Sequence, residues 1–400
     1  MAMQSPNTRY YFLDWLRMLA ILGVVLYHVG MFFVPWGWHI KNPELVGWLE
    51  TPMDIAHRLR MPLLFVIAGA VVAYSLNRRT VAALLQERSR RLLIPIVFGM
   101  FVIVPPQIYV ERMVNGEFSA DYLSYFFERV LQFQPYPVGD FAWHHLWFIV
   151  YLFVYMLLFT PLFAWWKKQP KRLQPGWWLL VLALPLGINE ALLRPYFPER
   201  HSLLNDWWTF NNYALLLLYG FFLSRLPGVW EWLQQRRRLL LALVGATVAV
   251  ILPLKAIQIV QAGNVWDGLS ANVFVWFSIL AMLGYAKQWL NRPSQWLMDI
   301  REAAYPTYIL HQTVIILLAW PLIDAPLSIA VKAAILIFGT MLCCLAVYAL
   351  LIRPFAVMRV LFGLPAQRQM AQGEKNEKNA VVYRADVVAG VNTAGRNPVV

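Results

Sequence analysis

Long apolar runs alternate with short polar segments along the chain, and about ten of these runs match the ~20 mostly apolar residues that a membrane-spanning helix needs. Transmembrane strands would instead alternate polar and apolar residues over ~10 positions, which these runs do not. The pattern predicts an all-α, polytopic transmembrane helix bundle. The predicted helices lie near 12–34, 60–77, 92–110, 144–165, 177–193, 209–224, 239–260, 269–286, 303–320 and 328–352.

The composition supports a membrane location. Hydrophobic residues make up 60% of the 400 residues and charged residues only 14%, whereas a soluble domain is about half apolar and about a quarter charged. The net charge is nevertheless +13. Nucleic-acid binding requires an exposed basic face, and most of this surface is suited to lipid, so we expect no nucleic-acid partner.

Basic residues are unevenly distributed among the loops. Most of the 34 Lys and Arg residues fall in one set of loops, and the loops on the other side are acidic on balance. Because short basic loops stay in the cytoplasm, we expect both termini to be cytoplasmic. The basic segments are 78–91, 166–176, 225–238, 287–301 and the tail after 353.

One domain accounts for the apolar runs, and we assign it to residues 1–365. Residues 366–400 turn polar and mixed in charge, with the stretch AQGEKNEKN, and are expected to form a disordered cytoplasmic tail. Cys343 and Cys344 are adjacent within the last run, which supports neither a disulfide framework nor a metal site.

The first predicted helix carries costly polar residues along one stripe. Asp14, Arg17 and His28 are spaced so that they share a helical face. Asp14 and Arg17 can pair near the inner surface, whereas His28 lies about 21 Å further along the helix. Ionisable groups inside a bilayer are functional candidates, although a single helical histidine is often only a packing residue.

The histidines as a set point to one side of the membrane. His28 and His311 lie within predicted helices, the other five lie on outer loops or outer helix ends, and no inner loop has any. An outward-facing cavity lined by imidazoles would suit proton transfer near neutral pH. No H-x-x-x-H pair occurs on a predicted helix, so we expect no metal site.

On the inner side, Arg88 and Arg91 are three residues apart and share a face at the entrance to the third predicted helix. Such a pair could bind the phosphates of a nucleotide-type ligand, because guanidinium groups bind phosphate oxygens bidentately. The alternative is a plain positive anchor at the membrane surface. No P-loop or G-x-G-x-x-G motif is present.

Five segments, in order, resemble the acyltransferase 3 family of integral membrane acyltransferases: YFLDWLRMLAILGVVLYH, RMPLLFVIAG, RSRRLLIP, HHLWFIVYLFVY and AAYPTYILHQ. The likeness runs from about residue 10 to 362 and is greatest to the branch that modifies periplasmic glucans. It implies a ten-helix protein of the bacterial inner membrane that transfers an acyl group, succinyl or acetyl, from cytoplasmic acyl-CoA to a glycan hydroxyl on the far side. No permanently bound cofactor is expected.

The resemblance also marks individual residues by their position in these motifs. The first-helix pair is Arg17 and His28, and the R-x-x-R pair is Arg88 and Arg91. The remaining motif residues are His145, Leu146, Trp147, Phe148, Tyr305, Tyr308 and His311. Ala68 and Ala304 stand where the family commonly has serine, so any role of those hydroxyls is absent or moved.

We hypothesise that His28 is the general base, with Asp14 and His311 in the catalytic set. Direct transfer and a covalent acyl-enzyme both remain open. We expect the CoA phosphates at Arg17, Arg88 and Arg91, and the acceptor at His145, Trp147, Tyr305 and Tyr308. An acyl carboxylate could meet one of three outer cations, Arg58, Arg60 and Arg194.

A transporter or exporter of a glycan or small anionic solute is the alternative. Such proteins also bury charges, as Glu190 and Lys255 would be, but the chain shows no repeated halves.

Overall fold

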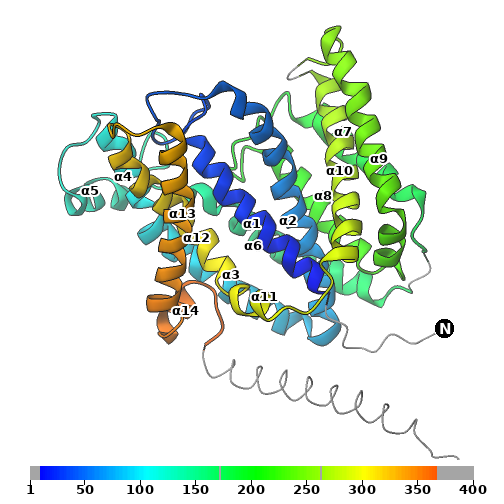
Figure 1. The fold of residues 1–400 in the computed structure, drawn as a ribbon. Helices are drawn as coiled ribbons and strands as arrows, with labels where there is room; N and C mark the ends of the chain where they lie inside the picture. The colour runs from blue at the N-terminus through cyan, green and yellow to red at the C-terminus, as the bar shows by residue number, and fades with distance from the viewer. Residues whose placement is uncertain (1–9, 171–172, 262–263, 367–400) are drawn as a thin grey trace, which may run out of the picture.

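A computed structural model describes residues 10–170, 173–261 and 264–366, which form helices and connecting loops (Figure 1). The predicted all-α fold is therefore confirmed over these ranges. The helices are α1 (Tyr11–Met31), α2 (Glu50–Arg78), α3 (Val81–Phe98), α4 (Pro105–Val114), α5 (Tyr122–Glu128), α6 (Trp147–Lys168), α7 (Ala183–Leu193), α8 (Trp207–Leu223), α9 (Val229–Ala256), α10 (Val265–Trp289), α11 (Gln295–Ile300), α12 (Ala304–Ala319), α13 (Ile329–Val347) and α14 (Ala356–Leu361).

Every predicted apolar run contains a helix. Within the described ranges, 7 helical stretches are long and apolar enough to cross a membrane: Tyr11–Met31, Gly47–Arg78, Val81–Val114, His144–Lys168, Val229–Ala256, Val265–Trp289 and Ile329–Ile352. The runs at α7, α8 and α12 form shorter helices. α12 ends just before Pro321, which lacks the N–H that would continue the helix.

Some helices begin earlier than the hydrophobic pattern indicates. α2 starts at Glu50 and α9 at Val229, each on a polar segment that precedes the apolar run. Hydropathy marks where a helix is apolar, whereas backbone hydrogen bonds continue through charged residues that face water. α9 exposes Leu241 and Leu252 at 50% and 61%, as expected for a helix that faces lipid.

α1 lies in the middle of the bundle and packs against α2, α10, α12 and α13. Its buried face includes Phe12, Leu16, Val24 and Val25. The polar residues Asp14, Arg17 and His28 of α1 therefore lie within the bundle.

Two glycines allow α2 and α8 to pack backbone to backbone. A Cβ atom at Gly69 would lie 2.0 Å from the Leu217 carbonyl oxygen, and one at Gly220 would lie 1.9 Å from the Val66 carbonyl oxygen. Only glycine fits at either position without moving a helix, because the obstructing atoms belong to the backbone. Gly69, which follows Ala68 in the motif RMPLLFVIAG, therefore has a packing role.

The bundle has two chemically distinct ends. Figure 1 places α11 and α14 at the end where α1 begins, and the loop 32–46 at the opposite end. The predicted tail at 366–400 lies outside the described residues apart from Ala366.

Candidate active site

The end of α1 that carries His28 opens onto a cavity of about 520 Å³. Six of the seven histidines of the chain line it, and His311 lies directly behind His28. The predicted imidazole-lined cavity is therefore present in the structure. Its lining histidines are His28, His39, His57, His144, His145 and His201.

The rings of His28 and His311 contact each other, and their hydrogen-bond partners assign which nitrogen of each ring carries the hydrogen. Nδ1 of His311 lies 2.6 Å from the Tyr308 carbonyl oxygen, so it donates there and leaves Nε2 as an acceptor. Nδ1 of His28 lies 2.9 Å from the Val24 carbonyl oxygen and 3.2 Å from Nε2 of His311, so it carries the other hydrogen. The lone pair of His28 is therefore on Nε2, the nitrogen that a general base needs free.

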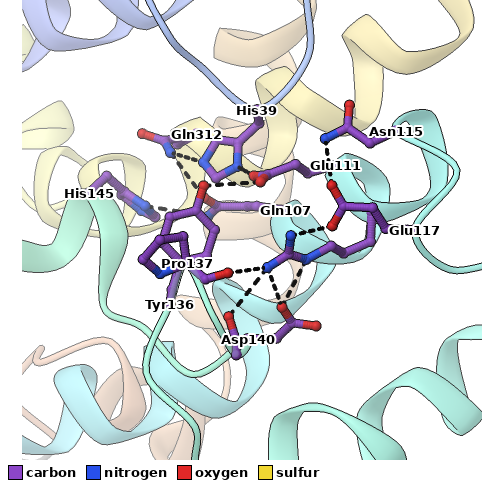
Figure 2. A network of polar contacts seen from close by, with 12 residues as sticks. His39, Gln107, Glu111, Asn115, Glu117, Tyr136, Pro137, Asp140, His145 and Gln312 are labelled. Atoms are coloured by element: carbon purple, nitrogen blue, oxygen red, sulfur yellow. Dashed lines mark hydrogen bonds and ion pairs between the residues drawn. The ribbon is translucent and has the colours of Figure 1, made fainter.

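A buried polar network links α12 to α4 and to His39 in the loop after α1 (Figure 2). Nδ1 of His39 donates to Glu111, and the Gln312 amide donates to Nε2 of His39 at 3.1 Å and to Oε1 of Gln107 at 3.0 Å. The amide of Gln107 donates to Thr313 at 2.6 Å. Sequence reasoning missed Gln107, Glu111 and Gln312. Gln107 and Gln312 are polar residues within apolar runs and Glu111 directly follows one, which was a signal that could have found them.

His145 joins this network through both ring nitrogens. Nε2 donates to the Ile309 carbonyl oxygen at 2.9 Å, and Nδ1 accepts from Gln107 at 3.3 Å. The Tyr308 hydroxyl donates to the His145 carbonyl oxygen at 2.5 Å. Both ring nitrogens of His145 are thus engaged within the protein, and the residue connects the start of α6 to α12. Its role at the acceptor stays a prediction.

Two further histidines of the cavity lining, His57 and His201, share the carboxylate of Glu199. Nε2 of His57 and Nε2 of His201 lie 3.5 and 3.0 Å from the Glu199 oxygens. Burial alone would raise the pKa of Glu199, but the hydrogen bonds from His201 and His57 outweigh it and hold that pKa well below its ordinary value. The ring of Trp147 stacks on His201 at 3.9 Å between centroids, which places this predicted acceptor residue in the cavity wall.

The three outer cations differ in their partners. Arg58 binds Asp54 at 2.8 Å and Arg194 binds Glu190 at 2.6 Å. Arg60 instead stacks over the Tyr27 ring, 3.5 Å from its centroid, and donates to Nδ1 of His57 at 3.2 Å. Of the three, only Arg60 lines the imidazole cavity.

The predicted phosphate-binding arginines gather at the other end of α1. The Arg17 guanidinium lies 3.5 Å from the Arg301 carbonyl oxygen. Arg88 lies 3.4 Å from the Ser75 hydroxyl and within electrostatic range of Arg17 and Arg91. The structure therefore brings together three basic residues from α1 and α3.

Arg91 is anchored by the segment that follows α14. Its Nε donates to the Gly363 carbonyl oxygen at 3.0 Å, and its Nη1 binds Glu87 at 3.1 Å. The Tyr305 hydroxyl donates to the Arg91 carbonyl oxygen at 3.1 Å. Tyr305 therefore lies at the arginine end and not at the imidazole cavity, where Tyr308 lies.

Asp14 also belongs to the arginine end. It lies in the first turn of α1, whereas His28 lies in the last, and the rise of an α-helix separates them by about 21 Å. The predicted catalytic set is therefore divided, with His28 and His311 paired and Asp14 distant from both.

Comparison with known proteins identifies relatives. A family model described as an acyltransferase domain matches residues 10–349. Glucans biosynthesis protein C from Salmonella schwarzengrund (strain CVM19633) is 24% identical over 198 residues, 47% of this chain and 50% of that protein. The protein of that name from Salmonella paratyphi B (strain ATCC BAA-1250 / SPB7) is 24% identical over 173 residues, 42% of this chain and 43% of that protein. The chain thus spans about half the length of these relatives or less. No solved structure matches it.

Proposed function

Since the chain belongs to the acyltransferase domain family, whose model spans residues 10–349, we propose that it transfers an acyl group from acyl-CoA to a glycan hydroxyl. It is a membrane acyltransferase with several apolar helices. In the proposal the acyl group is succinyl or acetyl, and the membrane is the bacterial inner membrane. The acceptor is a periplasmic or cell-surface glycan, and the name of the relatives, glucans biosynthesis protein C, supports a glucan.

The observation that carries the proposal is the His28–His311 pair in the imidazole cavity. A neutral imidazole with a free Nε2 can accept a hydroxyl proton, and its other nitrogen is already held by Val24 and His311. A base that is fixed in orientation and tautomer needs no rearrangement before reaction.

The arginine end supplies a site for the donor. CoA carries phosphates, and Arg17, Arg88 and Arg91 provide guanidinium groups at the start of α1 and on α3. With the phosphates there, the acyl end of the donor would extend along α1 towards His28.

In the transfer step, the glycan oxygen forms a bond to the thioester carbonyl carbon while its proton passes to Nε2 of His28. The carbon–sulfur bond then breaks, and the leaving thiolate takes the proton from His28. The products are a glycan ester and CoA with a free thiol, and neutral His28 is regenerated.

The test uses the purified full chain in detergent, with acetyl-CoA or succinyl-CoA and a glucan acceptor. Wild-type protein is expected to release CoA and to yield acylated glucan by mass spectrometry. We expect His28→Ala to lower the transfer rate at least 100-fold, since a positioned general base contributes about 10²–10⁴-fold. The matched control is Leu26→Ala, on the exposed face of the same helix.

Two outcomes would contradict the proposal. Transfer that persists unchanged in His28→Ala would exclude His28 as the base. Transport of a labelled glycan into proteoliposomes without any acyl donor would favour the exporter alternative.

A further inference from the structure

The imidazole cavity has an unbalanced charge. Of the described residues that line it, Arg60 is the one Lys or Arg, and none is Asp or Glu. The nearest carboxylates, Glu111 and Glu199, contact lining histidines but do not line the cavity themselves, so the one fixed charge in the lining is positive and favours an anionic group.

Arg60 itself is only 9% exposed, and its Nε and Nη1 groups are buried without a hydrogen-bond partner among the described residues. Buried charged donors that lack a partner destabilise the folded protein. A guanidinium left in this state, in the wall of a cavity, indicates that a ligand supplies the missing acceptor.

Neighbouring groups do not neutralise Arg60 directly. Its hydrogen bond to Nδ1 of His57 brings no carboxylate into contact with it, and Glu199 lies at the opposite nitrogen of that ring. Arg58, two residues earlier on α2, is by contrast paired with Asp54. The cavity cation is thus held in place by Tyr27 and His57 while part of its hydrogen-bonding capacity is unused.

The position of Arg60 relative to His28 suggests its use. The guanidinium stacks on Tyr27, the residue immediately before His28, and both Arg60 and His28 line the cavity. A substrate whose hydroxyl reaches Nε2 of His28 would therefore place its reacting centre in a space that Arg60 also borders.

We propose that Arg60 is a catalytic residue that binds the anionic oxygen formed on the acyl carbonyl during transfer. This rests on the proposed function. When the glycan oxygen bonds to the carbonyl carbon and His28 takes the proton, the carbonyl π electrons move to oxygen. Arg60 N–H groups stabilise that oxyanion, and the charge disappears when the carbonyl re-forms and the thiolate leaves.

The experiment measures kcat and KM for Arg60→Gln and Arg60→Lys, with acetyl-CoA and with succinyl-CoA. Loss of one oxyanion donor costs about 10²–10³-fold in kcat. We expect Arg60→Gln to show this loss with both donors and with KM for acyl-CoA changed less than about threefold, because the contact forms only in the transition state. Arg60→Lys keeps the charge but not the planar fork and is expected to lose about tenfold or more.

Arg58→Gln is the matched control, because it removes an equal charge from the same helix outside this cavity. Melting temperatures are compared for all variants, and if Arg60→Gln does not fold, Arg60→Lys decides. Wild-type kcat in Arg60→Lys or Arg60→Gln would overturn the role. A loss confined to succinyl-CoA would also overturn it, since Arg60 would then bind the acyl carboxylate. Absence of transfer by the wild-type protein would overturn the proposed function itself.

Discussion

At the scale of single residues, the hydrogen-bond partners of a buried polar side chain determine its role. His28 and His145 both line the cavity, but His145 uses both nitrogens within the protein whereas His28 keeps Nε2 free. The same residue type therefore serves as a structural connection in one place and as a candidate base in the other.

The arginine pair leads to a prediction about donor binding. Replacing Arg88 or Arg91 with Gln removes a charge-assisted hydrogen bond to phosphate, which contributes about 1.5–3 kcal/mol. We expect KM for acyl-CoA to rise tenfold or more, with KM for the glycan unchanged. Steady-state kinetics with each substrate varied in turn measures this.

Arg90→Gln is the control, because Arg90 lies between the pair in sequence and is exposed. Equal weakening of donor and acceptor binding in Arg88→Gln would instead indicate a structural anchor at the membrane surface.

Glu199 leads to a prediction about pH. Its pKa is held below the ordinary 4.5 in the folded protein by His201 and His57, against the opposing effect of burial. Ionised Glu199 therefore stabilises the folded protein fully above pH ~4.5. This stabilisation is lost as the pH falls below that value and through the lowered pKa of the folded protein. We expect the wild type to have a higher melting temperature than Glu199→Gln from pH 7 to 5, and the difference between the two melting temperatures to shrink below pH ~4.5.

Thermal unfolding of both proteins in detergent, at several pH values, checks this. Taking the difference in melting temperature between wild type and Glu199→Gln cancels the effect that protonation of other cavity histidines has on both proteins. A gap that grows as pH falls to 4 would contradict the depressed pKa.

At the scale of helices, close backbone contact between α2 and α8 supports the cavity, because α2 carries both His57 and Arg60. The contact depends on two positions where a side chain cannot fit, Gly69 and Gly220. Small residues at such crossings let helices approach in a membrane, where packing replaces the hydrophobic effect as the main attraction.

We therefore expect Gly220→Ala to destabilise the protein by about 2 kcal/mol or more, since overpacking typically costs 1–3 kcal/mol and here the obstructing atom is backbone. Thermal unfolding in detergent is the measurement. Gly245→Ala on α9 is the control, because a Cβ there meets nothing within 4 Å, and alanine favours a helix by ~1 kcal/mol. Similar melting temperatures for both variants would refute the close-packing account.

At the scale of the whole molecule, the two ends of the bundle face different substrates in the proposed reaction. The basic loops predict that the arginine end is cytoplasmic, where acyl-CoA is found, and the imidazole cavity would then open to the outside. The helix α1 joins the two ends, with Arg17 near its start and His28 in its last turn.

Labelling with a membrane-impermeant maleimide tests this orientation. In a background with Cys343 and Cys344 replaced by Ala, we expect Glu44→Cys to react in intact cells and Asn77→Cys to react only after permeabilisation. Both positions are exposed; Glu44 lies in the loop before α2 and Asn77 lies in the last turn of α2. The reverse pattern would contradict cytoplasmic placement of the arginine end.

The sequence by itself determined the fold class, the approximate helices and the separation of charge between loops. These follow from local properties, because hydrophobic run length and loop composition depend only on nearby residues. It also marked His28 as a candidate, since polar groups in apolar runs are costly, and the Arg88 and Arg91 pair through its three-residue spacing at the start of a run. The helix starts at α2 and α9 were less predictable, because backbone hydrogen bonding continues beyond the apolar residues.

Only the tertiary structure decided which candidates act together. His28 and His311 are separated by 283 positions in the chain, yet their ring nitrogens lie 3.2 Å apart. Asp14 shares a helix with His28 and is nevertheless far from it. The unused hydrogen-bonding capacity of Arg60 at Nε and Nη1 is likewise visible only where α2 packs beside α1, because a side chain's partners are set by packing between distant segments and no local spacing encodes them.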